Sequence, residues 1–118
     1  MKCEININRI GETVGDHPEE VYNHGSTVVG EDLYIFGGTN GTYCYNSIYK
    51  LLKGKTWVKI SCFWKPSYRS SMNFLTCDNL IYIFGGVNDK KGEKAEKAEK
   101  GEKGEKGEVF TDLHVFDT

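Results

Sequence analysis

Apolar residues along the chain fall in short runs separated by polar turns, which predicts strands rather than helices. The segment HGSTVVGEDLYIFGG, from His24, holds an apolar run, a polar turn at residues 30–32 and a second apolar run ending in a Gly-Gly pair. The segment MNFLTCDNLIYIFGG, from Met72, repeats this order, with its turn at residues 77–79. Each segment predicts a β-hairpin. The nearly continuous runs LYIF and LIYIF predict second strands that are buried on both faces.

The similarity resumes downstream of both hairpins. YNSIYKL, from Tyr45, parallels FTDLHVF, from Phe110, and both read as strands. After the first of them, a turn at residues 53–55 precedes TWVKIS, a further strand. One unit therefore contains four strands. Because a single four-stranded unit cannot bury both of its faces, such units stack against copies of themselves.

These features resemble the Kelch repeat of β-propellers. That family has a Gly-Gly pair ending the second strand, a tyrosine in the third strand and a tryptophan in the fourth. The residues at its motif positions here are His24, Gly37, Gly38, Tyr49, Trp57, Pro66, Arg69, Gly85 and Gly86. The second repeat departs from the motif, because Met72 stands at its histidine position and His114 at its tyrosine position. The resemblance implies an all-β fold, a partial Kelch-type β-propeller of antiparallel four-stranded blades with one charged low-complexity loop.

The motif residues have straightforward physical roles. Paired glycines allow positive φ and close approach of neighbouring strands. Tyr49 and Trp57 supply large apolar faces between blades, and each keeps a polar group for a hydrogen bond. Arg69 is expected to make structural hydrogen bonds between blades. An aromatic cage for a ligand is the less favoured interpretation of the tyrosine and tryptophan.

The repeat boundaries divide the chain into parts. Residues 1–20 are interpreted as the last strand of a preceding blade (3–10) plus a linker, residues 21–62 as a complete Kelch blade, and residues 63–118 as an incomplete one. Propellers close with about four to eight blades, so the chain is interpreted as a fragment of a larger propeller. Two blades alone would leave large apolar faces open to water. We therefore expect marginal stability, self-association or a longer native protein.

The second repeat carries a charged insert, residues 87–109. Between Gly86 and Phe110 lie 23 residues, against 6 between Gly38 and Tyr45, so the second repeat has gained 17. The tract is rich in Lys, Glu and Gly. Glutamates placed four residues before lysines favour a helix near residues 91–100, whereas the glycines oppose it. We expect a solvated loop, disordered or partly helical, in preference to a binding element.

Charge and cysteine content narrow the class of protein. A formal net charge of −2 gives no case for a nucleic-acid or anionic-membrane partner. The N-terminus lacks an apolar signal segment, and no apolar run reaches the ~20 residues that span a bilayer. The four cysteines have no metal-binding spacing, and buried free thiols of a cytoplasmic protein are expected at Cys3, Cys44, Cys62 and Cys77. No metal site and no cofactor are predicted.

The function that the resemblance implies is a non-catalytic protein-interaction module, acting as a scaffold or adaptor. Its partners would be an unidentified protein and other blades of the same or another chain. Loops and blade links lie on one face of such a ring, and the charged insert emerges there too, where it could gate access. Candidate partner-binding residues on that face are Asn23, Thr39, Asn40, Tyr43, Tyr68, Ser71, Asn88 and Asp89.

Two alternatives remain open at this point. The family also resembles the propellers of galactose oxidase and of some sugar epimerases, and Tyr43-Cys44-Tyr45 suggests a Cys–Tyr copper cofactor. Copper would further require converging histidines, and the three in the chain form no such set. No recognisable catalytic motif appears. The other alternative is a truncated product with no function of its own.

Overall fold

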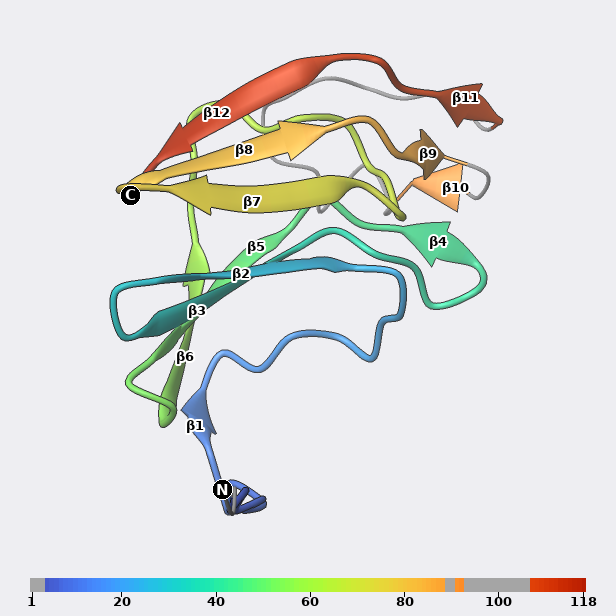
Figure 1. Ribbon diagram of the computed structural model, residues 1–118. Coiled ribbons are helices and arrows are strands. Elements are labelled where there is room, and N and C mark those ends of the chain that lie inside the picture. The colour runs from blue at the N-terminus through green and yellow to red at the C-terminus, as the bar shows by residue number, and fades with distance from the viewer. Residues whose placement is uncertain (1–3, 89–90, 93–106) are drawn as a thin grey trace.

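The first sheet contains one four-stranded unit in sequence order. The computed structural model describes residues 4–88, 91–92 and 107–118 (Figure 1). Its first sheet is built of β2 (Gly25–Val29), β3 (Asp32–Phe36), β5 (Ile48–Leu52) and β6 (Thr56–Ile60). These four strands are antiparallel neighbours, and the short β1 (Val14–Gly15) pairs parallel to β6 at the outer edge. We call this sheet the first blade.

The second sheet, the second blade, repeats three of these strands. It is built of β7 (Asn73–Cys77), β8 (Leu80–Phe84) and β12 (Leu113–Asp117), in the order β12-β8-β7. Two small pairs complete the described strands. They are β4 (Tyr43–Cys44) with β10 (Lys91–Gly92), parallel, and β9 (Val87–Asn88) with β11 (Glu108–Val109), antiparallel. The described residues contain no helix, so the all-β prediction is confirmed.

Both predicted hairpins are present. The β2–β3 and β7–β8 connections are two-residue turns, because Val29 is paired with Asp32 and Cys77 with Leu80. Their first turn residues, Gly30 and Asp78, have φ of 62° and 55°. Glycine and aspartate are among the few residues that adopt this left-handed conformation readily. The polar turns seen in the sequence thus set the register of each hairpin.

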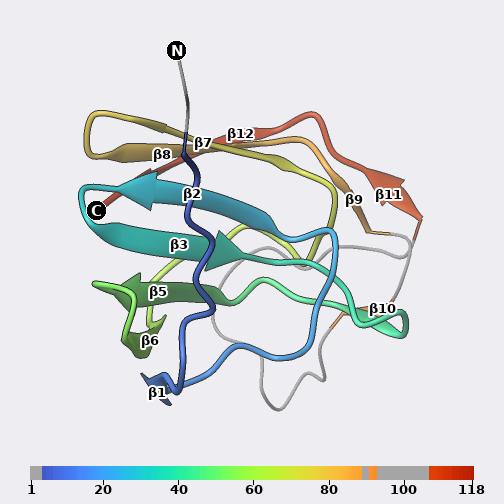
Figure 2. The same ribbon diagram turned by 60° about the horizontal axis from the view of Figure 1, so that its bottom comes forward.

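The core lies between the two blades, which stack face to face (Figures 1 and 2). Its buried side chains are Tyr34, Phe36, Ile48, Met72, Phe74, Ile81 and Ile83. The Phe36 and Phe74 rings stack with centroids 6.0 Å apart, and the hydroxyls of Thr27 and Thr76 are 2.7 Å apart. We call this contact the interblade interface. It joins β2, β3 and β5 of the first blade to β7, β8 and β12 of the second.

The hydrogen bonds reproduce the sequence repeat. Tyr22 and Thr39 exchange two backbone hydrogen bonds, and so do Ser70 and Val87, which are the residues 48 positions later. The amide of Gly37 donates to the Ser47 carbonyl at 3.1 Å, and the amide of Gly85 donates to the Asp112 carbonyl at 3.2 Å. The acceptors of this second pair of bonds are 65 positions apart. The difference between the two spacings equals the 17 inserted residues, so the repeat alignment is correct on both sides of the insert.

The predicted strand at residues 3–10 is wrong for the residues described. Residues 4–12 form no strand, and Ile5 and Ile7 are exposed. A strand needs a neighbour for its backbone donors and acceptors, and β1 already occupies the outer edge of β6. At that contact a Cβ on Gly15 would lie 2.2 Å from the Trp57 carbonyl oxygen, so the pairing depends on a glycine.

The expectation of strands buried on both faces is also wrong. In β8, Ile81 and Ile83 are buried in the interblade interface, whereas Phe84 points to the opposite face and is exposed. In β3, Leu33 and Ile35 are half-buried. Only one face of each sheet meets the other sheet, so burial alternates along these strands although their sequence is apolar throughout.

The described ends of the charged insert are strands. Residues 87–88 and 108–109 pair with each other, and Lys91–Gly92 lie in β10 where the sequence favoured a helix. Residues 89–90 and 93–106, with the rest of the disorder and helix prediction, lie outside the described residues. The prediction of buried thiols fails for Cys77, which is exposed because β7 turns it away from the interface, while Cys44 is buried and Cys62 half-buried. Cys3 lies outside the described part of the chain.

Candidate functional site

The irregular segments gather at one end of the two blades, opposite the hairpin turns, where Figure 1 shows β4, β9, β10 and β11. We call this region the loop end. It consists of loop residues 37–47, 85–88 and 107–112 and of the blade links 16–24 and 61–72. The two links touch, because the Ser71 amide donates to the Asn23 carbonyl at 2.8 Å. The β10–β4 pairing brings the start of the insert against the loop of the first blade.

Paired glycines permit the close packing of this end. Gly38 has a φ of 93°, and a Cβ on it would lie 2.9 Å from His24 Cβ and 3.0 Å from the Tyr22 carbonyl oxygen. Gly86 has a φ of 101°, and a Cβ there would lie 2.8 Å from the Ser70 carbonyl oxygen. A side chain at either position would strain the backbone and collide with the link.

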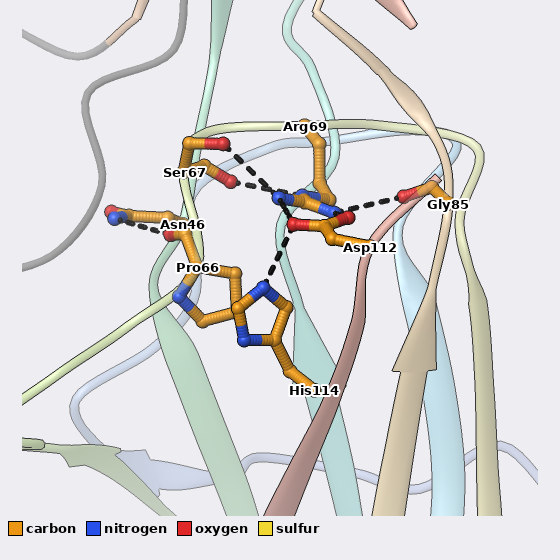
Figure 3. A network of polar contacts seen from close by, with 7 residues as sticks. All are labelled: Asn46, Pro66, Ser67, Arg69, Gly85, Asp112 and His114. Carbon is orange, nitrogen blue, oxygen red and sulfur yellow. Dashed lines mark hydrogen bonds and ion pairs between the residues drawn. The ribbon is translucent and has the colours of Figure 1, made fainter. Parts of the chain in front are cut away.

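A buried arginine holds the link to the second blade (Figure 3). Arg69 is fully buried, and its Nη1 and Nη2 donate to the two carboxylate oxygens of Asp112 at 2.5 and 2.9 Å. The guanidinium also donates to the carbonyl oxygens of Gly85 and Ser67, each at 3.1 Å, and to the Ser67 hydroxyl at 3.0 Å. Its Cζ lies 3.8 Å from the centre of the Phe110 ring. Bidentate and stacked contacts of this kind suit arginine specifically.

The backbone of the same arginine reaches the first blade. Its amide donates to the Tyr45 carbonyl at 3.2 Å, and its carbonyl accepts from the Gly38 amide at 2.9 Å. Arg69 therefore joins the loop of the first blade to Gly85 and Asp112, which flank β8 and β12 of the second. It lies among structural hydrogen bonds between blades and not in an open site.

Asp112 is the partner that sequence reasoning missed. Hydrogen bonds from Arg69, and then from His114, lower the pKa of this carboxyl from 3.8 to about 2, although partial burial acts in the opposite direction. His114 Nε2 lies 2.8 Å from Asp112 Oδ2. The available signal was an acidic residue directly before the third strand, where the first repeat has Ser47. Alone, it could not have been distinguished from an ordinary turn residue.

The arrangement offers little for catalysis. Both oxygens of the Asp112 carboxylate are engaged, and the Arg69 side chain is covered. In the described part of the chain, no three His, Cys, Asp or Glu residues come close enough together to hold a metal ion. Residues 4–88, 91–92 and 107–118 likewise include no helix long and apolar enough to cross a membrane.

Three of the predicted partner-binding residues are buried, which corrects their assignment. Thr39, Tyr68 and Asn88 are covered by the packing of the loop end. The Thr39 hydroxyl donates to the Tyr43 carbonyl at 2.7 Å and accepts from the Gly41 amide at 3.0 Å, so it fixes the loop. Asp89 lies outside the described residues.

The other four predicted residues face solvent at least in part. Asn23, Asn40 and Ser71 are exposed, and Tyr43 is half-buried. The Asn40 side chain is engaged within its own loop, since its amide donates to the Tyr45 hydroxyl at 3.0 Å and its carbonyl oxygen accepts from the Tyr43 amide at 2.8 Å. Asn23 and Ser71 have positive φ, 55° and 58°, at equivalent points of the two links. They mark matching turns of the two repeats.

Tyr22 is an exposed aromatic that sequence reasoning did not select. Its side chain is 52% exposed. A Cβ on Gly41 would lie 3.4 Å from its hydroxyl, so the ring reaches the tip of the β3–β5 loop. We call the surface formed by Tyr22, Asn23, Asn40, Gly41 and Thr42 the Tyr22 patch. An aromatic within the polar link VYNH was the available sequence signal, because tyrosine is enriched at interfaces.

Stacked antiparallel sheets whose links cross one common end are the blades of a β-propeller. Comparison with known families agrees, since residues 21–63 match the model of the Kelch motif. Residues 21–63 therefore carry a Kelch motif, and the two stacked sheets have the fold of part of a Kelch-type β-propeller. The matched region covers the first blade, and the hydrogen-bond register extends the repeat to the second.

Three relatives are much longer proteins. The chain is 34% identical over 77 residues to a tRNA wybutosine-synthesizing protein 2/3/4 of Oryza sativa subsp. japonica, covering 61% of this chain and 7% of that protein. It is 47% identical over 47 residues to an acyl-CoA-binding domain-containing protein 6 of the same organism, covering 39% of this chain and 7% of that one. It is 29% identical over 114 residues to the Rho GTPase-activating protein gacHH of Dictyostelium discoideum, covering 88% and 6%. The chain thus spans only a small fraction of each relative.

Proposed function

We propose that this chain is a non-catalytic, cytoplasmic protein-interaction module that binds a protein partner through the Tyr22 patch at its loop end. The Kelch motif supports an interaction role in general terms.

The observation that carries the proposal is the combination of a rigid loop end with an exposed aromatic. Backbone pairs between Tyr22 and Thr39 and between Ser70 and Val87 fix the link and loop positions. On this fixed base the Tyr22 ring is exposed beside polar residues at the tip of the loop. An aromatic that keeps its apolar surface in water, with polar groups around it, has the composition of an interface centre. Little ordering entropy would be lost on binding, because the loop is already held.

The names of the relatives support a binding role over a catalytic one. They name tRNA wybutosine synthesis, an acyl-CoA-binding domain and activation of a Rho GTPase, three unrelated activities. Each of these proteins shares only a small segment with this chain. A segment that recurs beside unrelated activities fits an attached binding module better than the source of any one of them.

Affinity purification with quantitative mass spectrometry tests the proposal. Wild-type chain is compared with Tyr22→Ala and Thr42→Ala, which alter the Tyr22 patch, and with Glu31→Ala, an exposed change at the opposite hairpin-turn end. We expect the two patch variants to lose the same specifically enriched protein and Glu31→Ala to retain it. Equal enrichment by all four proteins, each shown to be folded by circular dichroism, would refute the assignment of this surface.

A further inference from the structure

The outer face of the second blade is apolar and uncovered in the described part of the chain. This face points away from the first blade. Its exposed apolar residues are Leu75 (64%), Phe84 (46%), Leu113 (60%) and Val115 (53%). Their register places them on one side of the sheet, because Phe84 is paired with Leu113, and Tyr82 with both Leu75 and Val115. Contiguous apolar surface of this kind marks an interaction site.

The repeat shows what such a face is built to contact. Residue equivalence follows the two spacings, 48 positions before the insert and 65 across it. Phe84 is thereby equivalent to Phe36, and Leu113 to Ile48, both of which are buried in the interblade interface at 0% and 2% exposure. The outer face of the second blade therefore corresponds to the face that the first blade presents to its neighbour.

The complementary face is present on the same chain. The interblade interface uses Ile83 and Phe116 of the second blade, and their equivalents are Ile35 and Leu51 on the outer side of the first blade. On this side Val28 is 57% exposed, although Leu51 is covered. Each copy thus carries both halves of one interface, one half on each outer face.

Each contact of the interblade interface can be mapped onto the contact between two copies by the same residue equivalence. The Thr27–Thr76 hydroxyl contact becomes Leu75 of one copy against Val28 of the next, a polar pair replaced by an apolar pair.

The positions equivalent to Tyr34 and Phe116, whose ring centroids are 6.1 Å apart, hold Tyr82 and Leu51, and Leu51 is already buried within the chain. The stacked pair Phe36–Phe74 becomes Phe84 against the small Ser26.

One position requires a wider approach. A Cβ on Gly25 would lie 2.6 Å from Phe74 Cβ, and Asn73 stands at the position equivalent to Gly25. In a second copy, Asn73 would face Ser26. Within the chain the larger residue of this pair, Phe74, belongs to the second blade of the contact, whereas between copies the larger residue, Asn73, belongs to the blade equivalent to the first. The backbones must therefore lie slightly farther apart at this point than within the chain.

We propose that copies of this chain associate head to tail, with the outer face of the second blade of one copy packed against the outer face of the first blade of the next. The contact is heterologous, so it joins two different surfaces and leaves one face open at each end of a dimer. Further copies bind to these open faces through the same pair of surfaces. If the ring holds four to eight blades, it closes at about two to four copies.

Sedimentation velocity over a wide range of protein concentration tests the association with two blocking variants. Leu75→Glu places a charge on the outer face of the second blade, and Val28→Glu places one on that of the first. Burying an unpaired carboxylate in an apolar contact is unfavourable, so each variant alone should remain monomeric. Val109→Glu is the matched control, an exposed valine of β11 outside both faces, and should associate like wild type.

Mixing the two blocked variants is decisive. Val28→Glu keeps an intact second blade and Leu75→Glu an intact first blade, so an equimolar mixture should form a 1:1 dimer and nothing larger. Three results would overturn the proposal: a wild-type chain that is monomeric at every concentration, continued self-association of Val28→Glu, or a mixture that stays monomeric while circular dichroism shows both variants to be folded.

Discussion

Asp112→Asn isolates the ion pair that ties the blade link to the second blade. The substitution preserves shape, but it removes the negative charge that faces the buried Arg69 guanidinium at 2.5 and 2.9 Å. The guanidinium keeps its hydrogen bonds to Ser67 and Gly85. Without the Asp112 carboxylate, no negative charge compensates the positive charge of the buried guanidinium. We therefore expect the variant to fold with a reduced free energy of unfolding.

The magnitude follows from two independent considerations. The pKa of Asp112 lies at about 2 against a reference of 3.8, and at 1.36 kcal/mol per pKa unit this shift corresponds to about 2 kcal/mol of stabilisation. Breaking a fully buried ion pair costs about 3–5 kcal/mol. The Asp112 side chain is 30% exposed, and asparagine keeps one acceptor, so the lower part of this range applies. We expect a loss of about 2–3 kcal/mol near neutral pH.

The dependence on pH separates the charge from a packing effect. Because folding lowers this pKa, the stabilisation is fully present above the unfolded value of 3.8 and is lost as the pH falls through about 2. Urea unfolding followed by tryptophan fluorescence, at one low protein concentration, should show wild type and Asp112→Asn converging between pH 4 and 2.

Asp117→Asn is the matched control, an exposed carboxylate at the end of β12, the strand that directly follows Asp112, and we expect it to change the free energy of unfolding by less than about 0.5 kcal/mol. An Asp112→Asn variant as stable as this control would show that the ion pair with Arg69 does not stabilise the fold. A gap between Asp112→Asn and wild type that stays constant down to pH 2 would show the same, because packing and not charge would then explain the loss.

Three further substitutions test the packing of the fold through the free energy of unfolding in urea. Gly38→Ala should lower this free energy more than Gly30→Ala does, because its new Cβ would lie within 3.0 Å of His24 and the Tyr22 carbonyl. At Gly30 there is open space, so only the left-handed backbone penalty of about 1–2 kcal/mol applies, and equal losses for the two variants would contradict the contact at Gly38. Ile83→Ala should cost about 2–5 kcal/mol because the side chain is buried between the blades, whereas Val115→Ala on the exposed outer face of the monomer should cost far less. Tyr49→Phe should cost about 0.5–1.5 kcal/mol through the lost 3.0 Å hydrogen bond to Glu19, and a double-mutant cycle with Glu19→Gln that shows no coupling would argue against that bond.

The elements with local signals could be predicted from the sequence. Polar turns flanked by apolar runs predicted both hairpins, because turn chemistry and strand pattern act over a few neighbouring residues. The length of the insert was also predictable. The Gly37 and Gly85 hydrogen bonds are in step once 17 residues are allowed for.

Burial depended on partners that the sequence does not specify. An alternating segment such as CEINI can be a strand only if a free edge is available, and β1 already occupies the outer edge of β6. The apolar run LIYIF meets a neighbouring sheet on one face only, so Phe84 is exposed. Both errors came from assuming neighbours on every side.

The candidate site was predictable as a region, but not residue by residue. Loop position indicated the end of the blades at which the loops and links gather. It could not distinguish Thr39, whose hydroxyl is used inside the loop, from the neighbouring exposed Thr42. Tyr22 reaches a loop that is distant from it in the sequence, and a local sequence pattern does not reveal such a contact.

Nuclear Overhauser spectroscopy of the chain tests the stacking of the two repeats most directly. The structure places the Thr27 and Thr76 hydroxyls 2.7 Å apart and the Phe36 and Phe74 ring centroids 6.0 Å apart. We therefore predict cross-peaks between the side-chain protons of each pair, unchanged in the monomeric Leu75→Glu variant. Absence of both sets of cross-peaks in a folded sample with intact β2–β3 and β7–β8 hairpins would show that the two repeats do not stack as adjacent blades.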